Sequence, residues 1–140
     1  MGYPYGVEVA ITELIGKTLT KVEGAVGEDE IRFTLGDGSA YRLFHYQDCC
    51  ESVNIEDICG DLSDLVGSPI ISAEESTNEQ GEQPWPEGVP KPEFEDASWT
   101  WTFYRIATAK GLVVIRWYGS SNGYYGESVD FEKIDPTTKE

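Results

Sequence analysis

The sequence predicts an α+β fold that is mostly β, with a curled antiparallel sheet of about seven strands packed with one main helix. Three observations carry this prediction: a hairpin pattern over residues 30–46, a helical stripe over 54–66 and a second hairpin pattern over 98–118. With 140 residues, the chain is long enough to bury one hydrophobic core. We therefore expect a single domain over residues 1–140.

The first hairpin is indicated by strict alternation of apolar and polar residues, which is typical of a half-buried strand. The apolar members are Ile31, Phe33 and Leu35. Gly36-Asp37-Gly38 supplies the turn, because Gly and Asp tolerate positive φ. A three-residue loop at this turn pairs Leu35 with Ser39. In that register Phe33 lies opposite Tyr41 on the face that we expect to be buried.

Residues 54–66 have the pattern of a helix. Asn54 can serve as N-cap, with Asp57 as its reciprocal partner. Apolar side chains recur along one stripe at Ile55, Ile58, Leu62 and Leu65. Gly60 inside the stripe costs about 1 kcal/mol, and Gly67 is a stop signal. The main helix is therefore predicted over Asn54–Val66, and β-rich runs predict further strands over 17–23, 69–76 and 127–133.

A loop is predicted over residues 77–97, which are rich in proline and in acidic residues. This segment holds four of the seven prolines: Pro84, Pro86, Pro90 and Pro92. Proline-rich acidic segments of this length are typically extended. We expect a flexible acidic loop that interrupts the single domain.

The second hairpin allows two registers at Ala109-Lys110-Gly111. If Lys110-Gly111 is a two-residue loop, Arg105 and Arg116 lie on the same face of the sheet. If Gly111 ends a three-residue loop, Thr108 pairs with Leu112, and the two arginines lie on opposite faces. We favour the three-residue loop because it separates apolar from polar residues better, and a slip of one residue would undo that separation.

Charge and composition exclude several classes of partner. The formal net charge of −16 repels nucleic acid and anionic membranes. The chain has no apolar run of about 18 residues, and its first residues lack the basic and apolar regions of a signal peptide.

The cysteine count of three is odd, and adjacent Cys49 and Cys50 would close almost no loop. We expect a cytoplasmic protein without structural disulfides.

Two groups of side chains are candidates for chemistry. The first is a ligand site made of arginines, aromatic rings and a polar loop, in which guanidinium groups hold a phosphate while a ring stacks on a base. Its candidate members are Arg105, Arg116, Tyr104, Tyr118, Asn122, Tyr124 and Tyr125. The second is a weaker candidate for metal binding: His45, Asp48, Cys49, Cys50 and Cys59. These are zinc-ligand types, but they lack the paired spacing of a zinc finger or ribbon, so we interpret them as structural and predict no cofactor.

Three blocks of sequence are distinctive when taken together. They are HYQDCCESV at 45–53, EDICGDL at 56–62 with GSPI at 67–70, and SWTWTFY at 98–104 with IRWYGSSNGYY at 115–125. In these blocks the chain resembles a family of small uncharacterised proteins of bacteriophages and prophages, over roughly residues 14–131. The resemblance implies a viral origin, with the cytoplasm of the bacterial host as the location, and it contributes no catalytic assignment.

The sequence favours a non-enzymatic binding protein that counteracts a host defence. In one mode it sequesters a small nucleotide-like ligand through the arginines and aromatic residues, with a homo-oligomer interface as one setting for the site. In the alternative, the acidic protein mimics nucleic acid or inhibits a basic host protein. A metal-dependent enzyme built on the His45 region is the least favoured alternative.

Overall fold

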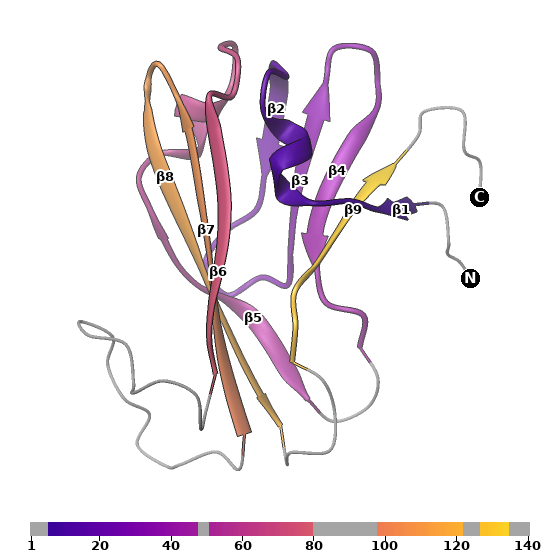
Figure 1. Cartoon of the computed structure of the whole chain (residues 1–140), viewed down its shortest axis with the longest axis vertical. Helices are drawn as coiled ribbons and strands as arrows, with labels where there is room; N and C mark the ends of the chain where they lie inside the picture. The colour runs from indigo at the N-terminus through magenta and orange to yellow at the C-terminus, as the bar shows by residue number, and fades with distance from the viewer. Residues whose placement is uncertain (1–5, 48–50, 80–97, 122–126, 135–140) are drawn as a thin grey trace.

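The computed structural model describes residues 6–47, 51–79, 98–121 and 127–134 (Figure 1). Within them the chain forms nine strands in two antiparallel sheets. The five-stranded sheet has the order β1 (Gly6–Glu8), β9 (Asp130–Ile134), β4 (Ala40–Phe44), β3 (Glu30–Leu35) and β2 (Leu19–Glu23). The four-stranded sheet has the order β5 (Ser52–Cys59), β8 (Gly111–Ser121), β7 (Ser98–Thr108) and β6 (Ser72–Glu79). The predicted α+β class with one main helix is therefore wrong.

One hydrophobic core lies between the two sheets, as in a β-sandwich (Figure 1). The five-stranded sheet contributes Ile31, Phe33, Tyr41, Leu43 and Phe131. The four-stranded sheet contributes Val53, Ile55, Tyr104, Ile106, Val113, Ile115 and Trp117. The ring of Phe131 stacks on Tyr41 at 5.4 Å and meets Phe33 edge-on at 6.2 Å. Two short 3-10 helices, η1 (Ile11–Leu14) and η2 (Leu62–Leu65), add Ile11, Leu14 and Leu65 to this core.

The first hairpin has the predicted register. Phe33 lies opposite Tyr41, and Ile31 lies opposite Leu43. The Leu35 amide donates to the Ser39 carbonyl at 2.9 Å and closes the three-residue loop. Gly38 has a φ of 92°, a conformation that glycine adopts at little cost. Local alternation and turn chemistry were sufficient for this element.

The helix predicted over Asn54–Val66 is wrong, because its first half is strand β5. This strand pairs with β8, and a bulge shifts the register between Ile55 and Asp57. A bulge adds one residue to one strand, so two inward-facing side chains can be three positions apart instead of two. Ile55 and Ile58 therefore both face the core, opposite Trp117 and Ile115. Their spacing imitates one turn of a helix.

The second half of the predicted helix is a sharp corner followed by η2. Gly60 has a φ of 107°, and a Cβ atom there would lie 2.7 Å from the Leu112 carbonyl oxygen. The Asp61 carboxylate then accepts from the Ser63 amide at 2.9 Å. This hydrogen bond and one from the Ser63 hydroxyl lower the pKa of Asp61. Capping of this kind begins the short helix whose Leu65 is fully buried.

Strand β6 begins at Ser72 and runs to Glu79, so the strand predicted over 69–76 extends into the predicted loop. The flexibility predicted for the rest of that loop, 80–97, lies outside the described residues. In the described part of the chain, no helix is long and apolar enough to cross a membrane.

Candidate functional site on the outer face of the four-stranded sheet

The register of the β7–β8 hairpin decides which side chains share a face. Thr108 pairs with Gly111, so the loop has two residues, Ala109 and Lys110. The favoured three-residue loop is therefore wrong. The alternative register placed the two-residue loop at Lys110-Gly111, one position too late. It correctly put Arg105 and Arg116 on one face of the sheet.

Contacts with η2 hold this register. The Thr108 hydroxyl donates to the Asp64 carbonyl at 2.5 Å and accepts from the Lys110 amide at 3.1 Å. The Lys110 ammonium donates to the Val66 carbonyl at 2.5 Å. These partners are 44 residues apart in the chain. Patterning within the hairpin therefore contains no signal for them.

The outer face of the four-stranded sheet carries rings and guanidinium groups. Its members from the central strands are Trp99, Trp101, Phe103, Arg105, Val114, Arg116 and Tyr118. Arg116 lies directly opposite Phe103, and Arg105 lies opposite Val114. The two arginines are diagonal neighbours, about 7–8 Å apart in an antiparallel pair. The register thus brings three of the seven predicted ligand residues, Arg105, Arg116 and Tyr118, onto one face.

Trp101 anchors this outer face. Its indole is 3% exposed. The Tyr118 ring lies 4.5 Å away, and the Arg116 guanidinium lies 5.5 Å from the indole centroid. Of the three tryptophans near this hairpin, Trp117 is the one that faces the inner core.

Arg116 is held by two carboxylates that the β5 bulge supplies. Its Nε and Nη2 atoms lie 2.6 Å and 2.5 Å from Glu56 Oε1. Its Nη2 atom also lies 3.7 Å from Asp57 Oδ2. Because a bulge sets two residues against one, Glu56 and Asp57 both reach this arginine. The guanidinium is therefore oriented before any ligand arrives.

Arg105 has different surroundings. Its Nη1 atom donates to the Ser76 hydroxyl at 2.9 Å, and its guanidinium lies 5.5 Å from the Phe103 ring centroid. Glu74 is its cross-strand partner on β6. Among the described residues, however, no carboxylate lies within ion-pair distance of Arg105. Of the two arginines, Arg105 therefore has the greater capacity to bind an anion.

Tyr104 lies on the opposite face of β7 from the arginines. Its side chain is fully buried, and its hydroxyl donates to Glu75 Oε2 at 2.9 Å. Burial, followed by the charge and hydrogen bond of Glu75, raises the pKa of Tyr104. The predicted site residues Asn122, Tyr124 and Tyr125 lie outside the described residues.

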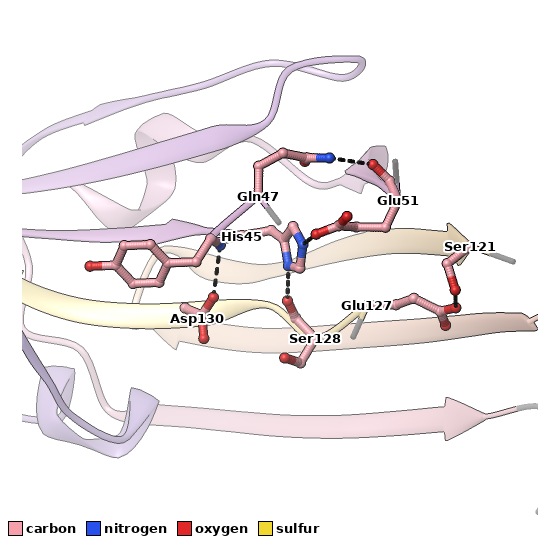
Figure 2. Close-up of polar contacts among 8 residues, drawn as sticks. His45, Gln47, Glu51, Ser121, Glu127, Ser128 and Asp130 are labelled. Carbon is pink, nitrogen blue, oxygen red and sulfur yellow. Dashed lines mark hydrogen bonds and ion pairs between the residues drawn. The ribbon is translucent and has the colours of Figure 1, made fainter. Parts of the chain in front are cut away.

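His45 forms a buried polar contact at the seam between the two sheets (Figure 2). Its Nδ1 atom lies 2.6 Å from the Ser128 carbonyl oxygen, and its Nε2 atom lies 2.6 Å from Glu51 Oε2. A carbonyl can only accept, so Nδ1 carries a hydrogen. The hydrogen between Nε2 and the carboxyl belongs either to an imidazolium or to a carboxylic acid. Both forms give one strong hydrogen bond.

This geometry separates the residues of the predicted metal group. Both ring nitrogens of His45 are engaged, and its side chain is 7% exposed. Glu51 precedes β5 and the exposed Cys59 ends it, about 25 Å away at 3.3 Å per residue. His45 and Cys59 therefore do not share a site. Asp48, Cys49 and Cys50 lie outside the described residues.

Two further buried carboxylates near the seam had no signal in the sequence. Glu127 accepts from the Ser121 hydroxyl at 2.5 Å (Figure 2). It also accepts from the Thr100 hydroxyl at 2.9 Å. Glu132 accepts from the Tyr46 hydroxyl and lies 3.6 Å from Arg42. Their partners are hydroxyls and a cation from distant strands, so these acids join strand ends within the fold.

Residues 12–131 match the family described as "Domain of unknown function (DUF7448)". Since the match covers more than half of the 140 residues, the chain belongs to this family. No curated protein and no solved structure matches the chain.

Proposed function

We propose that this member of the DUF7448 family is a non-enzymatic binding protein of a bacteriophage, which sequesters a small nucleotide-like ligand and so counteracts a host defence. The viral origin rests on the resemblance of the three sequence blocks. The observation that supports ligand binding is that Arg105 and Arg116 share one sheet face with Trp101, Phe103 and Tyr118.

Each group on this face suits one part of a nucleotide-like ligand. Two guanidinium groups about 7–8 Å apart can hold one phosphoryl group or two linked ones. An aromatic ring on a sheet surface offers a plane on which a base stacks. The carboxylates of Glu56 and Asp57 can accept hydrogen bonds from sugar hydroxyls. The ligand class is therefore one that combines a ring, hydroxyls and phosphate.

Calorimetry with a panel of cyclic mono- and dinucleotides tests this function. We expect one member of the panel to bind the wild type. Arg105→Ala should weaken that binding at least tenfold, because the ligand phosphate loses the arginine that has no described carboxylate within ion-pair distance. Arg116→Ala should weaken binding as well. Arg32→Ala is the matched control, since Arg32 lies on β3 of the other sheet and pairs at the surface with Glu30 at 3.6 Å. Absence of binding by the wild type would refute the proposal.

A basic host protein is the second candidate partner. The observation that favours it is the net charge of −16, together with the carboxylates of Glu56, Asp57 and Glu74 beside the two arginines. Complexes steered by such surface charge weaken as salt rises. A pull-down from host lysate at low and high salt checks this, and recovery of no basic partner at either salt concentration counts against it.

A further inference from the structure

Three of the four sheet edges in the described part of the chain are protected against pairing with another strand. Strand β1 has only three residues. Strand β2 has a bulge between Leu19 and Lys21. Strand β5 is bulged, and its outer edge at Ile55 exchanges backbone hydrogen bonds with Gly27 at 2.8 Å and Glu28 at 2.9 Å. Shortness, bulges and covering segments are the usual devices that block edge pairing.

The fourth edge, β6, lacks these devices. Its eight residues pair with β7 without a shift, from Ser72 opposite Ala107 to Glu79 opposite Thr100. The helix η1 packs against this strand. Along the exposed residues 74–77, no other described segment makes a backbone hydrogen bond with it. Alternate residues of such an edge direct their N–H and C=O groups away from the sheet.

The charge on β6 selects among the strands that could pair with it. Glu74 and Glu75 are exposed, and Glu79 ends the strand, which contains no lysine, arginine or proline. A second copy pairing here would bring glutamates of both chains onto one ladder, where like charges repel. A strand with lysine or arginine side chains would instead place opposite charges across the ladder.

We infer that the exposed edge of β6, residues 74–77, accepts an extended lysine- or arginine-bearing segment of a partner protein as a fifth strand of this sheet. Backbone hydrogen bonds supply the affinity in this mode of recognition, and the glutamates supply the preference. The inference rests on the second candidate function for the basic character of the partner. It does not require Arg116, which lies on β8, two strands away from β6.

A capped peptide of alternating lysine and valine is the probe for this edge, and amide hydrogen exchange of the whole chain is the readout. We expect the peptide to slow exchange within residues 74–77 at least about tenfold. The same peptide methylated on alternate amide nitrogens should give no protection, because it cannot complete the ladder. Glu74→Lys should weaken binding of the peptide. Glu8→Lys, an equal change of charge on the exposed strand β1, should leave peptide binding unchanged.

Three results would overturn the inference. The methylated peptide could bind as well as the unmethylated one, which would indicate charge attraction alone. Protection could fall on another strand. The amides of β6 could also be fully protected in the free protein, and sedimentation would then assign the cover to a second copy or to residues 80–97. Arg116→Ala should leave peptide binding unchanged, because Arg116 lies on β8, two strands away from β6, so failure of this inference is distinguishable from failure of the nucleotide proposal.

Discussion

Replacing His45 by leucine should be among the most destabilising changes in this protein. The Glu51 side chain is fully buried, and the imidazole of His45 faces its Oε2 atom at 2.6 Å. The change removes the hydrogen bond between the ring and the buried Glu51 carboxyl, and the loss of a hydrogen bond to a buried polar group typically costs about 1–3 kcal/mol. The substitution also removes the hydrogen bond between the His45 ring and the Ser128 carbonyl, and this loss costs about 1 kcal/mol more.

Glu51→Gln is the matched variant. A glutamine amide can donate to Nε2 of a neutral imidazole, so one hydrogen bond between the two side chains remains. We expect this variant to lose about 1 kcal/mol, well below the loss for His45→Leu. Urea unfolding followed by tryptophan fluorescence gives both free energies of unfolding. If both variants lose less than about 1 kcal/mol, or lose the same amount, the buried pair does not hold the seam as we argue.

Two further predictions concern the backbone corner and the tyrosines. Gly60→Ala should destabilise the fold by about 1–3 kcal/mol, because its Cβ would lie 2.7 Å from the Leu112 carbonyl oxygen. Gly16→Ala should cost less, since Gly16 has a similar φ of 89° but a Cβ there would have no neighbour within 4 Å. Equal losses of unfolding free energy in urea would show that crowding at Gly60 is unimportant. Burial, with the nearby Glu13 and Asp37, raises the pKa of Tyr41 to about 12. The unfolded chain releases this proton near pH 10, so stability should fall between about pH 10 and 12. Tyr41→Phe should flatten that fall in denaturant midpoints, and an unchanged slope would contradict the assignment.

Elements defined by neighbouring residues could be predicted from the sequence. The β3–β4 hairpin has both its alternation and its turn within residues 30–44, so its register followed from them. The β5 strand was misread for a physical reason. Its bulge places Ile55 and Ile58 on one side, and a spacing of three is also that of a helix.

Features that depend on distant segments could not be predicted. The register of the β7–β8 turn is held by Asp64 and Val66, 44 residues away from their partners. His45 and Ser128 are 83 residues apart, so the contact between them cannot be predicted from neighbouring residues. The residue types around His45 suggested metal binding instead of the buried contact with Glu51. The arginine and aromatic residues of the candidate site were found by residue type. Their division between two faces required the structure, which separated Tyr104 from Tyr118.

The measurement that tests the ligand proposal most directly is a titration with the panel nucleotide that binds best, followed through the indole N–H signals by NMR. Trp101 lies on the outer face under Arg116, and Trp117 lies in the inner core. We predict that the Trp101 signal shifts with ligand, that the Trp117 signal stays in place, and that Arg105→Ala abolishes the shift. A response of Trp117 without Trp101, or a Trp101 shift that survives in Arg105→Ala, would contradict binding on this face.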